Sequence, residues 1–110
     1  TMYDMKNMAR LVELERAAPQ AMAAFNAFGD AAFADGAVPR KYKELIAVAV
    51  ALATQCPYCI EFHTRDARRH GAGDAELAEA ALVSAAIRAG GAVTHAAHLF
   101  KATPQASAAK

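Results

Sequence analysis

The sequence predicts an all-α protein. Alanine, the strongest helix former, is the most frequent residue of the 110-residue chain, whereas strand-favouring residues are sparse. Hydrophobic residues make up 55% of the chain and recur mainly at helical spacing, with no strand-like alternation. Because this length suits one domain, we expect a single helical domain over residues 1–101 and a disordered tail over residues 102–110.

Two helices are predicted in the N-terminal third. Apolar residues recur every three or four positions over residues 5–16, and this pattern stops before Pro19. Pro19 suits an early helical position, and a second apolar pattern follows it as far as an Asp–Gly turn at 35–36. The aromatic residues expected in the core or in a subunit interface are Phe25, Phe28, Phe33 and Tyr42.

A central helical hairpin is predicted next. The segment 40–55 contains the continuous apolar run Leu45 to Ala53, which indicates a helix buried on all sides. Pro57 ends that helix and suits the first position of another, which should run to His70 and end at Gly71. The apolar run is about half as long as the roughly 20 residues of a membrane span. We therefore expect a soluble protein.

The last predicted helix begins with Asp74 as its cap. An alanine-rich pattern follows, which continues or bends at Gly90–Gly91 and reaches Lys101. The chain should therefore contain about five to six helices.

Charge and composition restrict the partners. The net charge is +1 and the pI about 7.8, which gives no electrostatic reason to expect nucleic acid or a membrane surface as a partner. The apolar fraction is high for a small monomer, which favours a homo-oligomer. The N-terminus lacks a signal architecture, so we expect a cytoplasmic, reducing location, where paired cysteines are more often catalytic or metal-binding than structural.

Cys56 and Cys59 flank the predicted start of the second hairpin helix. Unpaired backbone amides and the helix dipole stabilise a thiolate at such a position. With two residues between them, the two sulfurs can approach closely enough to form a disulfide. The pair is therefore a candidate dithiol–disulfide redox centre.

His63 lies one helical turn after Cys59, where its imidazole can accept the thiol proton. This spacing favours Cys59 as the attacking thiol. An orienting carboxylate could come from Asp66 or from Glu44, which is the better candidate. In an antiparallel hairpin Glu44 and His63 differ in level by roughly 6 Å, within reach of two side chains or a bridging water.

These residues resemble a known family. The pattern of Glu44, eleven intervening residues, Cys56-Pro57-Tyr58-Cys59, three further residues and His63 resembles the carboxymuconolactone decarboxylase-like superfamily, specifically its alkylhydroperoxidase AhpD-like branch. The resemblance covers residues 40–101, including the Gly71-x-Gly73-Asp74 turn.

The resemblance implies an AhpD-like helical bundle that assembles into homotrimers or homohexamers and acts as an antioxidant peroxidase without a cofactor. Glu44 and His63 would form a proton relay that activates Cys59, and Cys56 would resolve the resulting sulfenic acid into a disulfide. A thiol reductant or a peroxiredoxin would be the redox partner. In alkylhydroperoxidase D itself a second histidine stands at the position of Tyr58. We therefore expect neither its full peroxidase efficiency nor the same reductant or peroxiredoxin partner to carry over to this chain.

Other interpretations remain open. A zinc site could combine the cysteines with His63, Glu44 or His95, although no second cysteine pair is present and we expect no metal. A haem attachment would need a histidine where Ile60 stands. The functional alternatives are a disulfide reductase or adaptor to a peroxiredoxin, a non-redox lactone decarboxylase, a small-molecule binder and a purely structural oligomer.

Two aromatic residues, Tyr58 and Phe62, are expected to line the pocket and shield the thiols from water. The remaining histidines, which receive no chemical role, are His70, His95 and His98. The basic run that we expect on the solvated face comprises Arg65, Arg68 and Arg69.

Overall fold

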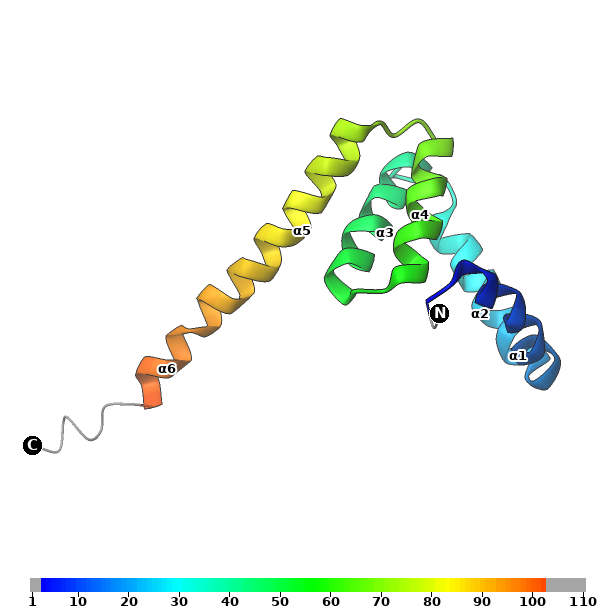
Figure 1. Cartoon of the computed structure of the whole chain (residues 1–110), viewed down its shortest axis with the longest axis horizontal. Helices are drawn as coiled ribbons and strands as arrows, with labels where there is room; N and C mark the ends of the chain where they lie inside the picture. Colours follow the sequence, from blue (N-terminus) through cyan, green and yellow to red (C-terminus); the bar gives the residue numbers. More distant parts are fainter. Residues whose placement is uncertain (1–2, 103–110) are drawn as a thin grey trace, which may run out of the picture.

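The computed structural model describes residues 3–102, in which every regular element is helical (Figure 1). The all-α prediction is confirmed. In chain order the elements are a 3-10 helix η1 (Met5–Arg10) and the α-helices α1 (Leu11–Ala17), α2 (Pro19–Phe33), α3 (Arg40–Thr54), α4 (Pro57–Arg69), α5 (Asp74–His95) and α6 (Ala97–Ala102). The predicted disordered tail, apart from residue 102 at the end of α6, lies outside the described residues.

The first predicted helix is divided in two. Asp4 caps a 3-10 segment by accepting the Lys6 N–H at 2.9 Å, and α-helical bonding begins only at Leu11. The expectation of one continuous helix over 5–16 was therefore wrong, because apolar spacing does not distinguish a 3-10 turn from an α-helical one.

The hairpin of α3 and α4 is the centre of the fold, and α3 packs against both α4 and α5 (Figure 1). The corner depends on Gln55, which adopts the left-handed conformation with φ 57° and ψ 49°. Its N–H and that of Cys56 donate back to carbonyl groups of the last turn of α3, which ends the helix. The chain then reverses, and the cysteine pair lies at the start of α4.

The turn between α4 and α5 uses Gly71, whose φ of +97° favours glycine. Asp74, predicted as the cap of α5, is instead its first helical residue, and Gly73 occupies the cap position. The Gly73 N–H donates to Glu76 Oε1 at 3.2 Å, while the Asp74 carboxylate accepts from Arg68 at 2.8 Å. The Asp74 carboxylate therefore pairs with Arg68 on α4 and does not cap α5.

Helix α5 continues without a bend through both glycines and, with α6, forms an arm that extends away from the hairpin (Figure 1). The arm is attached to α3 by its first half. Lys41 pairs with Glu76 at 2.8 Å, Ser84 Oγ donates to the Ala49 carbonyl at 2.8 Å, and Arg88 donates to the Ala53 carbonyl at 2.6 Å. The radius of gyration is 19.9 Å, against about 13 Å for a compact domain of this size.

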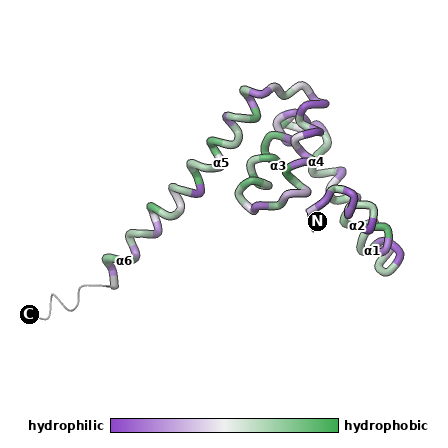
Figure 2. Tube along the Cα trace, viewed as in Figure 1, coloured by the Kyte–Doolittle hydropathy of each residue, from purple (hydrophilic) through white to green (hydrophobic). Residues whose placement is uncertain are grey.

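The prediction that Leu45 to Ala53 is buried on all sides was wrong for the single chain. Val48 and Ala51 are buried, but Ile46 and Val50 are 55% and 54% exposed, because within one chain α4 and α5 cover only part of α3. Figure 2 shows that apolar residues run along α3 and recur along α5. Phe25 and Phe28 are also exposed and so are not core residues.

The stretch Asp74–Lys101 is long and apolar enough to cross a membrane: its most apolar 18-residue window has a mean hydropathy of 1.3, and 6% of that window is buried. Only the shorter run Leu45 to Ala53 was compared above with the length of a membrane span, and that run does not indicate this longer stretch. One such helix is weak evidence for a membrane span, because length and composition are equally suited to a helix that is covered by other protein.

Candidate functional site

The cysteine pair occupies the N-terminus of α4, as predicted. Cys56 is the N-cap, and its Sγ accepts the Cys59 N–H at 3.3 Å. Pro57 fills the first helical position, where its missing N–H costs no hydrogen bond. Both cysteines are half-buried free thiols.

The two thiols have opposite pKa shifts. The Cys59 S–H donates to Cys56 Sγ, and this bond, with the Cys59 backbone N–H, lowers the pKa of Cys56. The same bond, together with burial and the nearby charge of Cys56, raises the pKa of Cys59 to about 11. The first negative charge on the pair therefore resides on Cys56, the thiol at the helix N-terminus.

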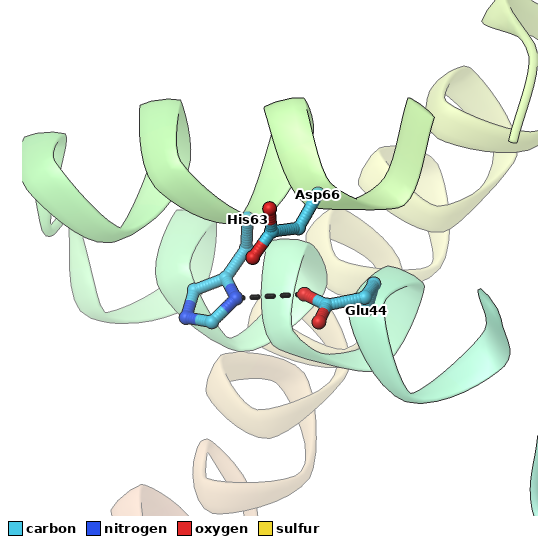
Figure 3. Close-up of side chains that lie close together, drawn as sticks. All are labelled: Glu44, His63 and Asp66. Carbon is cyan, nitrogen blue, oxygen red and sulfur yellow. Dashed lines mark hydrogen bonds and ion pairs between the residues drawn. The ribbon is translucent and has the colours of Figure 1, made fainter. Parts of the chain in front are cut away.

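Glu44 and His63 join the two hairpin helices. Glu44 on α3 is fully buried, and its Oε1 lies 2.8 Å from Nδ1 of His63 on α4 (Figure 3). Oε2 of the same carboxylate accepts from Arg40 Nε at 2.7 Å. Since a carboxylate oxygen accepts, Nδ1 carries the proton and Nε2, on the side of the ring away from Glu44, is the nitrogen able to accept one (Figure 3).

Two aromatic rings hold the imidazole in place. Phe33, the last residue of α2, stacks on His63 with 5.1 Å between ring centroids and an interplanar angle of 5°. Phe62 meets the same imidazole at a 77° angle. The Arg40 guanidinium lies 5.5 Å from the centroid of Phe33, so arginine, phenylalanine and imidazole form a layered group.

Asp66, the other carboxylate considered for His63, is engaged elsewhere. It lies close to Glu44 and His63, and the possible ligand atoms of the three residues are all within 4.8 Å of one another (Figure 3). However, Asp66 pairs with Arg69 at 2.7 Å, as Glu44 does with Arg40. Each carboxylate is thus already neutralised by an arginine, which disfavours a cation there.

The zinc set considered from the sequence is not assembled. Among residues 3–102, neither cysteine belongs to a group of three or more potential ligands. His95 lies at the end of α5, where its Nδ1–H donates to the Gly91 carbonyl and its ring contacts His98. His70 Nδ1 is bonded to the Asp66 carbonyl in α4.

A cavity of about 490 Å³ opens beside the site. Cys59 and His63 both reach it, and most of its wall is apolar. Its lining consists of Ala32, Phe33, Val38, Lys43, Ile46, Ala47, Val50, Ala51, Thr54, Cys59 and His63.

Tyr58 and Phe62, predicted as pocket residues, are not in this lining. Tyr58 faces the N-terminal segment, where its hydroxyl accepts from Asn7 Nδ2 at 3.1 Å and its ring contacts Tyr3. Phe62 is 42% exposed, and its ring contacts His63. Phe33 and Arg40, which the sequence does not indicate as site residues, lie closer: Phe33 stacks on His63, and Arg40 donates to Glu44. Arg40 could have been found from its i,i+4 spacing to Glu44, but nothing in the sequence links Phe33 to His63.

The comparisons with known proteins agree with this fold and motif. Residues 19–102 match the model of the carboxymuconolactone decarboxylase family, and the chain belongs to this family. It is 50% identical over 91 residues to "Uncharacterized protein 4 in cox locus" of Paracoccus denitrificans, a match that covers 83% of this chain and 82% of that protein. An uncharacterized protein of Cupriavidus necator is 46% identical over 77 residues, covering 64% of this chain and 68% of its own.

Two crystal structures share the fold. A Methanobacterium thermoautotrophicum protein superposes with a TM-score of 0.75 at 36% identity, covering 79% of this chain and 98% of its own. The apo form of a carboxymuconolactone decarboxylase family protein from Legionella pneumophila gives 0.74 at 33% identity, covering 92% of this chain and 90% of its own. The superfamily predicted from the motif is thereby confirmed.

Proposed function

We propose that this chain is a thiol-dependent peroxidase that reduces organic hydroperoxides at Cys56 and Cys59. The observation that carries the proposal is that Cys59 and His63 open into one apolar cavity while the imidazole is bonded to the buried Glu44. An apolar wall suits the organic part of a hydroperoxide, and the thiol and the base lie where its reactive oxygens would enter.

The proposed reaction has two steps. Cys59 gives up its proton and attacks the terminal oxygen of the hydroperoxide, and the O–O bond breaks. The departing alkoxide takes up that proton through His63, so the products are a Cys59 sulfenic acid and an alcohol. The Cys56 thiolate then displaces the sulfenic hydroxyl, which takes up a proton from solvent and leaves as water, and a disulfide forms. A dithiol reductant supplies two electrons and two protons to restore the pair.

The raised pKa of Cys59 makes a base necessary. With a pKa of about 11, this thiol is protonated at neutral pH and must lose its proton as it attacks. The Cys56 thiolate, which already accepts the Cys59 S–H, can take that proton, and His63 Nε2, backed by Glu44, can take it onward. In this scheme Cys59 attacks and Cys56 resolves.

The assembly is proposed to be a homotrimer or homohexamer. The support is the exposed apolar surface of the arm, which includes Leu82, Val83, Ile87, Val93, Leu99 and Phe100. Apolar surface on this scale favours contact with further copies of the chain. The remaining expectations are a cytoplasmic location, a thiol reductant or peroxiredoxin as partner, and no requirement for a cofactor.

Peroxide consumption tests the proposal. Wild type, Cys59→Ser and Cys56→Ser are each given cumene hydroperoxide with a chemical dithiol as electron donor. We expect turnover by wild type and its loss in Cys59→Ser. An inert wild type, or two variants that retain the rate of peroxide consumption, would show the proposal to be wrong. If instead both cysteine variants turned over a lactone as fast as wild type, the cysteine-independent decarboxylase chemistry would be supported.

A disulfide reductase is the second candidate, and the lowered pKa of Cys56 favours it. A low-pKa thiol at a helix N-terminus is the nucleophile typical of thiol–disulfide exchange. Rapid reduction of a mixed disulfide by a wild-type chain that does not consume peroxide would support this function instead.

A further inference from the structure

We propose that Arg40 is a positioning residue that holds the Glu44–His63 pair in its working geometry. The residue lies outside the motif of carboxylate, cysteines and histidine. This inference extends the proposed function, in which that pair moves the thiol proton.

Arg40 fixes one oxygen of the carboxylate. Its Nε donates to Glu44 Oε2 at 2.7 Å, which leaves Oε1 directed at His63 Nδ1 at 2.8 Å. A carboxylate anchored at one oxygen loses rotational freedom, so the second oxygen keeps the imidazole in the Nδ1–H tautomer.

Arg40 is itself held from two sides. Its backbone N–H donates to Asp35 Oδ1 at 2.6 Å, and its guanidinium lies against the Phe33 ring. Phe33 in turn stacks on His63. The contacts therefore close a circuit from Arg40 through Glu44 to His63 and back through Phe33, and this circuit joins the end of α2 to the hairpin.

Arg40 also balances charge. Glu44 is fully buried, and the Arg40 side chain is 34% exposed, so the arginine shields the carboxylate while it keeps contact with water. Without the guanidinium, the full negative charge would act on His63 alone. That would favour the imidazolium, which cannot accept a proton.

The variants are Arg40→Met, which keeps the apolar stem, and Arg40→Lys, which keeps the charge. Arg40→Gln keeps an N–H donor without the charge and serves if Arg40→Met does not fold. The matched control is Arg65→Met, because Arg65 pairs with Glu61 at the same i,i+4 separation and at 2.8 Å on the exposed face of α4. Circular dichroism verifies that each variant retains the helical fold.

The first measurement is the nitrogen NMR spectrum of the His63 ring in the reduced chain. We expect a protonated Nδ1 and an unprotonated Nε2 in wild type and in Arg65→Met. In Arg40→Met or Arg40→Gln, a mixture of tautomers would move the two nitrogen shifts toward each other, and protonation would move both toward imidazolium values. Arg40→Lys should recover the wild-type shifts in part. This measurement does not depend on peroxidase activity.

The second measurement is the pH profile of disulfide formation with cumene hydroperoxide. Arg40→Met should lower the rate about tenfold and move the acid limb to higher pH. The role of Arg40 would be overturned if the His63 ring shifts in Arg40→Met matched those of wild type. It would also be overturned if Arg40→Met oxidised at the wild-type rate although Glu44→Gln oxidised more slowly. If wild type does not react with hydroperoxide at all, the proposed function fails, and the ring shifts still decide the role of Arg40.

Discussion

Glu44 Oε1 and His63 Nδ1 lie 2.8 Å apart, although nineteen positions separate the two residues in the sequence. The contact crosses from α3 to α4 and exists because the left-handed turn at Gln55 reverses the chain between them. It places a fully buried carboxylate behind an imidazole that reaches the cavity beside Cys59.

Replacing Glu44 by glutamine should slow hydroperoxide-driven oxidation about a hundredfold near neutral pH, the order of effect expected when general-base assistance is lost. The neutral amide no longer stabilises an imidazolium and does not fix the Nδ1–H tautomer. Stopped-flow oxidation of the reduced chain measures the rate. Glu61→Gln, an exposed carboxylate on α4, is the control and should match wild type. Equal rates for the two variants would remove Glu44 from the relay.

The thiols should change each other's pKa in predictable directions. Cys59→Ala removes the S–H donor, so the pKa of Cys56 should rise toward its ordinary value. Cys56→Ala removes the acceptor and its charge, so the pKa of Cys59 should fall from about 11. Alkylation rates followed against pH give both values. If either remaining cysteine titrates as it does in wild type, the thiol–thiol hydrogen bond is not what shifts the pair.

The salt bridge between Lys41 and Glu76 should make stability depend on pH. It lowers the pKa of Glu76, so its contribution is present above the unfolded-state pKa of the carboxyl and is lost as pH falls through the folded value. It raises the pKa of Lys41, so the contribution is also lost as pH rises through that folded value.

Lys41→Met should therefore lower the urea midpoint at pH 7 and have a smaller effect at pH 3. Arg16→Met, which breaks the exposed pair with Glu13, is the comparison and should change neither midpoint appreciably. If Lys41→Met lowered the urea midpoint equally at pH 7 and pH 3, Lys41 would act through the packing of its aliphatic stem and not through its charge.

The arm of α5 should be an assembly surface. Ile87 is 72% exposed, so Ile87→Glu should leave the single chain folded but shift it to smaller species in sedimentation velocity. Ala85 lies two residues earlier, about 200° around the helix, so Ala85→Glu is the matched control. A wild-type chain that is already monomeric, or two variants that assemble equally well, would contradict the oligomer proposal.

Much of the site could be predicted because it depends on local rules. Pro57 at a first helical position places Cys56 at the cap, and a hairpin of known rise brings Glu44 within side-chain reach of His63. The surroundings could not be predicted in the same way. That Ile46 is exposed, that Tyr58 faces Asn7, and that Phe33 stacks on His63 all depend on which helices are neighbours.

Helical periodicity identifies an apolar face but not what covers it. The continuous run at Leu45 to Ala53 therefore predicts a fully buried helix, whereas one chain covers only part of it. The thiol pKa directions also depend on which sulfur donates to the other, a detail that the Cys-x-x-Cys spacing does not contain.

The most direct test of the central claim is to trap the sulfenic acid. Reduced Cys56→Ser is treated with one equivalent of cumene hydroperoxide and dimedone, and the modified residue is identified by tandem mass spectrometry, with Cys59→Ser as the matched sample. We predict a dimedone adduct on Cys59 in Cys56→Ser and none on Cys56 in Cys59→Ser. An adduct on Cys56 alone, or no adduct in either variant, would contradict the assignment of Cys59 as the attacking thiol.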